Sequence, residues 1–133
     1  STSHATDIPH RIAHQLEHHF AVPQVAIRLW KISSLFAQDS YTQGVTEDSK
    51  VFASSLTGCY CGANADFEAA HWLAQPEQAS SMALLPLRQI GQTEAFGLLV
   101  LASPDPQRFE AGMGTDFLQR IADIASAALS RLL

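Results

Sequence analysis

The sequence has no long hydrophobic run, few cysteines and no recognisable leader. Its longest apolar run, residues 95–102, is interrupted by Gly97, whereas a helix that spans a membrane needs about 18 or more apolar residues. No basic segment followed by an apolar stretch opens the chain, so we expect no signal peptide. Two cysteines are too few for a disulfide scaffold, which favours a reducing, cytoplasmic setting away from the membrane.

Basic residues are scarce too. The chain has 8 lysines and arginines against 13 aspartates and glutamates, which gives a net charge of −5. Proteins dedicated to nucleic acids or to anionic lipids need a basic surface, so we expect neither partner. Hydrophobic residues make up 47% of the chain, which is enough for the core of one globular domain.

Familiar catalytic patterns are missing as well. The sequence shows no serine–histidine–aspartate arrangement, no pair of catalytic carboxylates and no phosphate-binding glycine loop. The segment EAGMGTD, residues 110–116, lacks the preceding strand and the lysine of a P-loop. The sequence therefore leaves any cofactor unknown, and the two cysteines are its main candidates for covalent chemistry.

Hydrophobic periodicity predicts an amphipathic helix over residues 7–20. Apolar residues recur there at every fourth position and form one stripe. Thr6 or Asp7 can act as the N-cap, and Pro9 lies in the first turn, where its missing N–H costs nothing.

A strand is predicted over residues 25–30, whose sequence is VAIRLW. Strand alternation divides these residues into two faces: Val25, Ile27 and Leu29 on one, and Ala26, Arg28 and Trp30 on the other. We expect a second strand over residues 32–36 and a polar loop over residues 38–44.

The middle of the chain is predicted to be a helical insert. A short helix begins near Thr46, with acidic residues in its first turn, and Gly58 is placed to end it. Residues 66–74 are a second helical candidate, ended by Pro76.

Two strong strands and a long helix complete the chain. Residues 81–88 and 95–103 form a hairpin signal around a polar turn, and residues 111–132 carry a broad apolar helical face. We expect an α+β fold, with a central antiparallel sheet, terminal helices on one face and the insert over the other.

The C-terminal segment SSMALLPLRQIGQTEAFGLLVLASPDPQRF and the helix after it resemble a GAF domain. VPQVAIRLW, YCG, SMALLPL, GLLVLASPDPQRF and MGTDFL further resemble a bacterial family of GAF-like proteins of unknown function. The resemblance implies a GAF-like domain over residues 22–133, preceded by residues 1–21 as the remnant of a longer helical region. It also implies a small-molecule pocket between sheet and insert, and a homodimer formed through the terminal helices.

Both cysteines lie in the segment LTGCYCGAN, residues 56–64. If Tyr60 is in a strand, Cys59 and Cys61 project to the same face. They then suit a metal site, a strained disulfide or a redox couple, but structural zinc needs about four ligands, and the nearest histidine is His71. We favour the simpler interpretation that the two small side chains pack in the wall of the pocket.

One enzymatic alternative comes from the same resemblance, because some GAF-fold proteins reduce free methionine sulfoxide with pocket cysteines. Such a reaction needs a thiolate of low pKa and a second, resolving thiol. Cys59 and Cys61 would have to supply both, although their spacing does not resemble that of the reductases.

The histidines of the first helix form a second candidate site. His10, His14 and His18 are spaced one turn apart on one helix face, and paired histidines are good zinc ligands. No third ligand is evident except Glu17 at the edge, so we interpret this as a solvated polar face without a metal.

Seven residues are our candidates for contacting a ligand. Arg28 can hold a carboxylate or phosphate if its face of the strand lines the pocket, and Trp30 can stack on a flat ligand. The other wall candidates are Phe52, Tyr60, Cys61, Trp72 and Met82.

We therefore expect a non-enzymatic sensory domain that binds an unidentified small molecule and signals through a helical dimer. The alternatives are the thiol-dependent reductase and a pure dimerisation scaffold.

Overall fold

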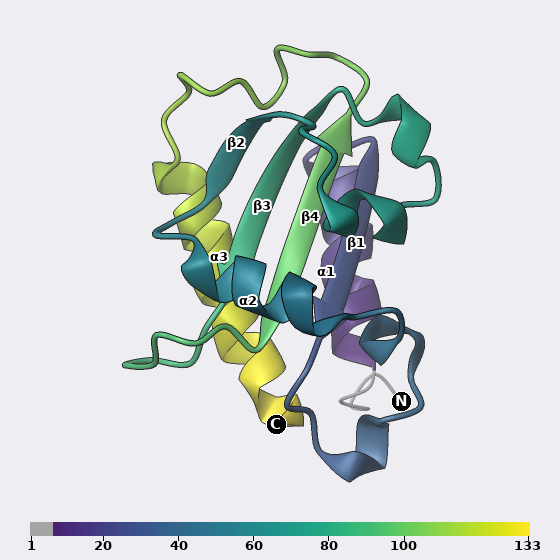
Figure 1. Ribbon diagram of the computed structural model, residues 1–133, viewed down its shortest axis with the longest axis vertical. Coiled ribbons are helices and arrows are strands. Elements are labelled where there is room, and N and C mark those ends of the chain that lie inside the picture. The colour runs from purple at the N-terminus through teal and green to yellow at the C-terminus, as the bar shows by residue number, and fades with distance from the viewer. Residues whose placement is uncertain (1–6) are drawn as a thin grey trace.

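The computed structural model describes residues 7–133 and consists of a four-stranded antiparallel sheet with helices on both faces. The sheet order is β1-β4-β3-β2, so β1 and β2 are the edge strands (Figure 1). The elements are α1 (Ile8–His19), β1 (Gln24–Leu29), α2 (Glu47–Ser55), β2 (Tyr60–Ala63), β3 (Ser81–Leu87), β4 (Gly97–Ser103) and α3 (Asp116–Leu129). Short 3-10 helices interrupt the connections: η2 (Ser34–Phe36), η3 (Ser40–Thr42), η4 (Glu68–Trp72), η5 (Pro76–Gln78) and η6 (Ser130–Leu132).

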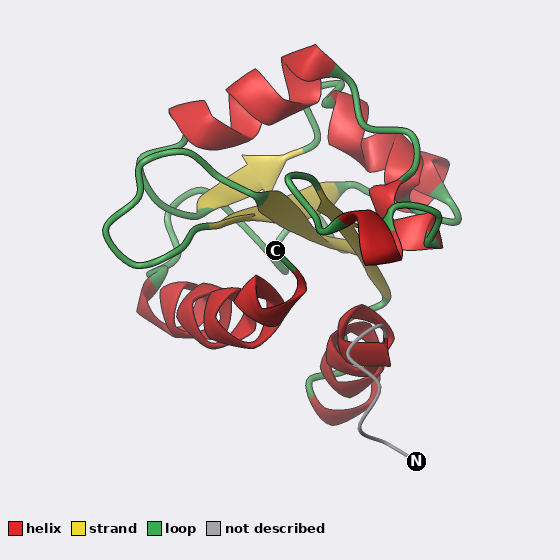
Figure 2. Ribbon diagram, turned by 90° about the horizontal axis from the view of Figure 1, so that it is seen from below, coloured by secondary structure: helices red, strands yellow, loops and turns green. Residues whose placement is uncertain are grey.

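The sheet is the middle layer of three. Seen along its edge in Figure 2, it has α1 and α3 on one side and the shorter helices on the other. We call these sides the helix face and the insert face, and we call α2 together with residues 64–79 the insert. This arrangement confirms the α+β architecture expected from the sequence, including the placement of the terminal helices. None of the helices among residues 7–133 is long and apolar enough to cross a membrane.

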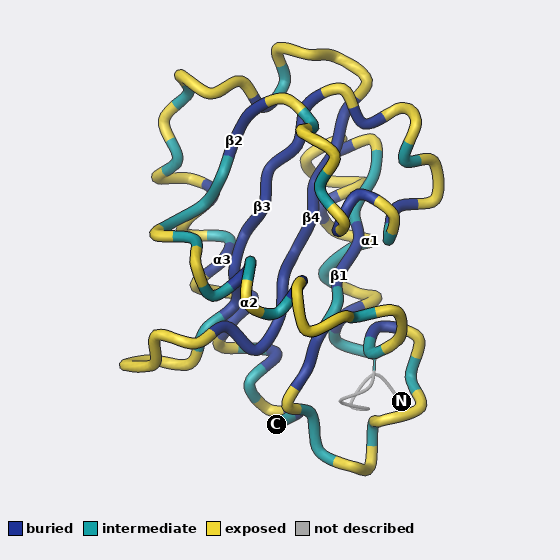
Figure 3. The backbone as a smooth tube through the Cα atoms, in the orientation of Figure 1, coloured by how far each residue is buried: buried dark blue, intermediate teal, exposed yellow. Residues whose placement is uncertain are grey.

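The central hairpin holds the layers together. Every residue of β3 and β4 is buried (Figure 3). The two strands pair in antiparallel register, with Leu84 opposite Val100. Strands covered on both faces have continuous apolar sequences rather than alternating ones, which explains the runs SMALLPL and GLLVLAS.

Each face of the sheet has its own hydrophobic core. On the helix face, Leu85 and Leu99 pack with Leu118 and Leu129 of α3. On the insert face, the buried residues are mostly smaller, including four alanines from the insert and its flanks: Ala53, Ala69, Ala70 and Ala79. The insert therefore lies close to the sheet without supplying large side chains at every position.

The predicted face assignment of residues 25–30 is confirmed. Ile27 and Leu29 belong to the helix-face core, whereas Ala26 and Trp30 belong to the insert-face core. Arg28 projects with the second group, because its cation lies over the ring of Trp72 in the insert.

The strand expected over residues 32–36 is wrong. Lys31 adopts a positive φ of 62°, which turns the chain out of the sheet directly after β1. Ser33 then caps η2 with its side chain and bonds through its N–H to the carbonyl of Leu132. The backbone groups are thus satisfied locally and by the C-terminal segment, so no neighbouring strand is needed.

Three helical predictions are also adjusted. The first helix spans Ile8–His19, and its N-cap Asp7 makes no side-chain cap bond, while Thr6 lies outside the described residues. The last helix starts at Asp116 rather than at residue 111, because the glycine-containing segment before it forms a turn in which Met113 bonds to Glu110. The candidate helix at residues 66–74 is the short 3-10 helix η4.

We predict that Gly97→Ala destabilises the fold by about 1–3 kcal/mol in urea denaturation, the usual cost of overpacking a core. A methyl group at this position would lie 2.6 Å from Cδ2 of Leu29 and 2.8 Å from the carbonyl oxygen of Arg28, so two strands would have to separate. Gly112→Ala is the matched control, because nothing lies within 4 Å of its added methyl group. An equal loss in both variants would contradict the close packing of β1 on β4.

Candidate functional site

A cavity of about 240 Å³ lies between the insert and the sheet, and we call it the insert cavity. Its walls come from the first turns of α2 and from the segment that leads into η4, and Leu98 of β4 forms part of its floor. The lining residues are Asp48, Ser49, Phe52, Asp66, Phe67, Glu68, Ala69 and Leu98.

Thr46 fixes the two walls of the insert cavity relative to each other. Its hydroxyl accepts the N–H of Ser49 at 3.1 Å, which caps α2, and it also donates to Oε2 of Glu68 at 2.6 Å. Next to this contact, Asp66 adopts a left-handed φ of 58°, and the amide oxygen of Asn64 accepts the N–H of Phe67. The cap and the turn together hold the lining side chains at the cavity.

Three aromatic rings line or back the cavity. The ring centroids of Phe52 and Phe67 are 5.5 Å apart, and Tyr60 meets Phe67 edge-on at 5.1 Å. The hydroxyl of Tyr60 donates to the carbonyl of Ala63 at 2.9 Å. This side of the cavity therefore presents apolar ring surface with its polar group already bonded.

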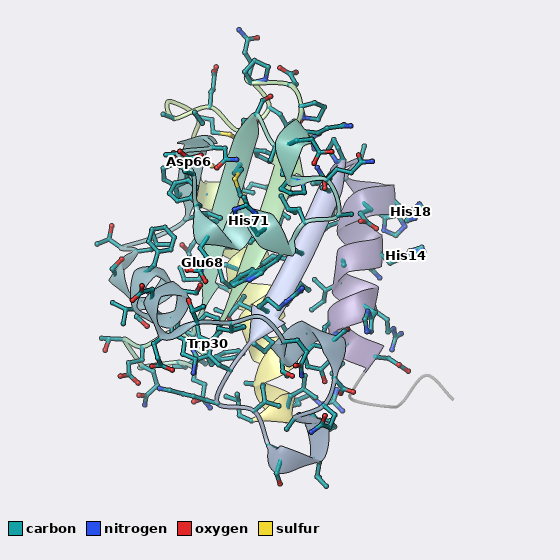
Figure 4. The ribbon with its side chains drawn as sticks, turned by 45° about the vertical axis from the view of Figure 1, so that its right-hand side comes forward. His14, His18, Trp30, Asp66, Glu68 and His71 are labelled. Carbon is teal, nitrogen blue, oxygen red and sulfur yellow. The ribbon has the colours of Figure 1, made fainter. Side chains whose placement is uncertain are left out.

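The charged lining of the insert cavity is entirely acidic. Asp48, Asp66 and Glu68 are exposed carboxylates, and among residues 7–133 no lysine, arginine or histidine lines the cavity. Figure 4 shows Asp66 and Glu68 on the segment that crosses the insert face. The nearby Lys50 bonds to Glu47 instead. Carboxylates beside aromatic rings form a site suited to a cation or to a donor-rich molecule.

A second, smaller cavity of about 150 Å³ lies at the free edge of β1, and we call it the edge cavity. Its walls come from β1, the first half of α1, η3 and the insert; the lining residues are Pro9, His10, Ala13, Val25, Ala26, Ile27, Arg28, Ser40, Tyr41 and Trp72.

Arg28, a residue of β1, contributes a positive charge to the edge cavity. Its Nε donates to the carbonyl of Gln43 and its Nη1 to that of Ile27, both at 2.9 Å. Its guanidinium carbon lies 5.7 Å from the ring centroid of Trp72, whose Nε1 donates to the carbonyl of Gly44. Burial lowers the pKa of Arg28.

The structure divides the seven sequence-predicted contact residues into four groups. Phe52 lines the insert cavity and Arg28 and Trp72 line the edge cavity, while Tyr60 packs against Phe67 behind the first. Trp30 and Met82 are buried in the insert-face core beneath the cavities, and Nε1 of Trp30 is satisfied by the carbonyl of Ala95 at 2.8 Å.

The seventh residue, Cys61, lies on the helix face of the sheet. The prediction that it lines the ligand pocket together with the other six residues is therefore wrong. Cys61 pairs with Ala83, and both belong to the helix-face core. Met82, the neighbour of Ala83, faces the insert. Successive side chains of a strand point to opposite faces of the sheet. Cys61, which faces the same way as Ala83, therefore cannot line a cavity on the side of Met82.

Both cysteines are free and share the helix face, as the alternation around Tyr60 predicted. Cys59 is half-buried, and its thiol lies 3.6 Å from Oε1 of Gln119 in α3. Burial raises the pKa of Cys59 to about 11, helped by the negative charges of Cys61 and Asp123 and opposed by Arg88. Burial also raises the pKa of Cys61. Neither environment favours the thiolate that redox or metal chemistry requires.

The predicted histidine face is exposed. His14 and His18 lie side by side on the outer surface of α1, with ring centroids 4.1 Å apart (Figure 4). Within residues 7–133, no group of three or more histidine, cysteine, aspartate or glutamate side chains is arranged to hold a metal ion. Nothing in that range completes a site around the histidine pair.

Sequence reasoning missed the acidic part of the insert cavity. Asp66 and Glu68 flank Phe67 in the motif DFE, and Asp48 lies in the first turn of a predicted helix. The acid–aromatic–acid pattern was a usable signal, but its partner across the cavity is 18 residues away from Asp66 and meets it only through the fold.

Comparison with known proteins yields one family and one solved fold. Residues 1–133 match the family described as "Protein of unknown function, DUF484". A solved structure, the type II free methionine-R-sulfoxide reductase from Thermoplasma acidophilum, aligns with a TM-score of 0.56 over 98% of this chain and 97% of that one. The two sequences are 12% identical, so the likeness concerns the GAF-like fold alone. No curated protein matches the chain.

We predict that iodoacetamide alkylates Cys59 about 100-fold more slowly in the native protein than in the urea-unfolded chain at pH 7.5. The environment raises the pKa of Cys59 from 9.0 to about 11, and each pH unit removes about nine-tenths of the thiolate. The native rate should keep rising up to about pH 11, whereas that of the unfolded chain levels off earlier. Cys61→Ser isolates the signal of Cys59, and a native rate equal to the unfolded one would contradict the protected thiol.

Proposed function

The chain belongs to the DUF484 family, and we propose that it is a non-enzymatic, GAF-like sensory domain that binds a small molecule in the insert cavity. The observation that carries this proposal is the cavity itself, which has an apolar floor, aromatic side walls and a carboxylate rim. A pure dimerisation scaffold would have no reason to keep polar groups around a hollow of about 240 Å³.

The lining chemistry favours a small organic cation. Phe52 and Phe67 offer ring surface, which attracts an ammonium group, and the three carboxylates provide hydrogen-bond acceptors and negative charge. Each such contact contributes about 0.5–2 kcal/mol, so a ligand that makes several of them would bind in the micromolar to millimolar range.

The thiol-based reductase is the weaker candidate. Its chemistry needs a cysteine in the ligand pocket and a thiolate near neutral pH. Cys61 lies across the sheet from the insert cavity, and the pKa of both thiols is raised. The reductase of similar fold is 12% identical, and this likeness supplies no catalytic residues.

Assembly through the terminal helices is the second part of the proposal. Phe117 and Ile124 on α3 and Phe20 at the end of α1 are large apolar side chains with 55%, 66% and 44% of their surface exposed. The rings of Phe20 and Phe117 lie 5.4 Å apart and join the two helices into one apolar surface. A second copy of this chain offers the same surface in return, which a two-fold dimer requires.

A ligand in the insert cavity can influence that surface through the sheet. The floor residue Leu98 belongs to β4, which pairs with β3, and α3 packs on β3. A ligand that draws the insert closer to β4 would therefore shift the position of α3, the helix that carries Phe117 and Ile124.

We expect at least one small organic cation in a panel of tetramethylammonium, choline and putrescine to raise the Tm and to give saturable heats in calorimetry. Asp66→Asn and Phe67→Ala should each weaken this binding about tenfold, the effect of losing one charged or ring contact. An uncharged isostere of choline, in which carbon replaces the nitrogen, should leave the Tm unchanged, because it lacks the cation.

Two matched variants control this experiment. Glu77→Gln removes an exposed carboxylate that lies outside the cavity, and Ile90→Ala shortens a fully exposed apolar side chain that does not line it. Both should bind like the wild type. The proposal fails if none of the three cations binds, or if the cavity variants and the control variants lose affinity equally.

We also expect sedimentation velocity to show a dimer at high micromolar concentration, and Phe117→Glu with Ile124→Glu to make the protein monomeric. Charged side chains in place of exposed apolar ones disrupt a hydrophobic contact without disturbing the buried core. Val51→Glu, in an equally exposed position on α2, is the control and should remain dimeric. A monomeric wild type would contradict assembly through this surface.

A further inference from the structure

The edge cavity presents hydrogen-bond donors from the backbone of β1. The N–H of Trp30 bonds to the carbonyl of Phe96 in the segment leading into β4, and strand groups alternate in direction. The N–H groups of Arg28 and Ala26 therefore face β4, whereas that of Ile27 faces the free edge. Because Ile27 lines the edge cavity, this donor is available to a ligand there.

The guanidinium of Arg28 adds an uncompensated positive charge. Arg28 is half-buried between β1 and Trp72, yet it forms no ion pair among residues 7–133. Its Nε and Nη1 bond only to neutral carbonyls, and Nη2 makes no hydrogen bond in that range. A charge withdrawn from water is normally compensated by an opposite charge.

The other residues that line the edge cavity also favour a negatively charged ligand. Within the described part of the chain, no aspartate or glutamate lines the edge cavity, and His10 and Ser40 contribute further groups able to donate. The insert cavity has the opposite character, with three carboxylates and, among residues 7–133, no basic side chain. The two cavities therefore favour ligands of opposite charge.

We propose that the edge cavity is a binding site for a small oxyanion, a carboxylate or a phosphate group, held by Arg28 and the N–H of Ile27. A planar guanidinium with a free edge matches the paired oxygens of these groups. The volume of about 150 Å³ limits the anionic group to a small one. This site is separate from the cavity of the proposed function, and its occupation does not depend on a cation binding there.

Titration of ¹⁵N-labelled protein with sodium phosphate and with sodium acetate, at constant ionic strength against chloride, tests the site. We expect saturable shifts of the Ile27 N–H and the Arg28 Nε–H resonances. Tighter binding of acetate points to a carboxylic acid as the natural ligand, and tighter binding of phosphate points to a phosphate ester. The absence of saturable shifts with both anions would overturn the proposal.

Arg28→Gln should weaken anion binding at least about tenfold, because a charge-assisted contact is lost. Arg108→Gln is the matched control: Arg108 also bonds to backbone carbonyls, those of Ala21 and Phe20, and also lies over a ring, that of Phe109, but it does not line the cavity. Equal affinity in Arg28→Gln and the wild type would overturn the proposal, as would an equal loss in the control.

The amide resonances of β3 and β4 report whether each variant is folded. If Arg28→Gln does not fold, Arg28→Lys decides, because lysine keeps the charge but lacks the planar fork. Weaker binding of both anions by a folded Arg28→Lys supports the site, and unchanged binding contradicts it.

Discussion

The burial of β3 and β4 on both faces determines where the other elements lie. Each of the two strands contributes seven buried residues, and exposing either face would cost roughly 1.5–3 kcal/mol for every large apolar side chain. Two long helices, α1 and α3, cover one face with leucines and isoleucines. The other face is covered by short helices and loops that bring mostly alanines against the sheet. Both faces of the sheet are therefore buried, one by large side chains of regular helices and the other by small side chains of an irregular segment.

The irregular cover of the insert face leaves the insert cavity unfilled. A continuous helix packs its side chains against a sheet at near-crystalline density, as α3 does on the helix face. The insert instead needs Thr46 to join α2 to η4 and a left-handed residue at Asp66 to turn the chain. Such segments bring polar groups to the edge of the core without filling the space above Leu98. The insert cavity and the edge cavity each have a residue of the sheet in their walls, and both lie at the margins of this cover.

Local patterns predicted the layers, but pairing between distant strands decided the site. Alternation within residues 25–30 correctly separated the faces of Ile27 and Arg28, because side-chain direction in a strand is a local property. The same rule placed Cys59 and Cys61 together but could not say on which face. That depends on the pairing of Cys61 with Ala83, more than 20 residues away. The turn at Lys31 was equally invisible, since lysine has no particular preference for its positive φ.

The position of β1 at the sheet edge explains why opposite charges can coexist on one face. Arg28 pairs with Leu98, so the guanidinium and the floor of the acidic insert cavity belong to neighbouring positions of adjacent strands. In a central strand, the backbone N–H groups beside the arginine would be used by another strand. At the edge they remain free, and together with the guanidinium they form a donor surface that the carboxylates of α2 and η4 do not neutralise. The helix face, in contrast, carries both thiols, whose pKa values are raised, and the exposed apolar residues Phe117 and Ile124. The proposed ligand cavity above Leu98 and the proposed dimer surface on α3 lie on opposite faces of the sheet, so coupling between them would pass through β4 and through β3, on which α3 packs.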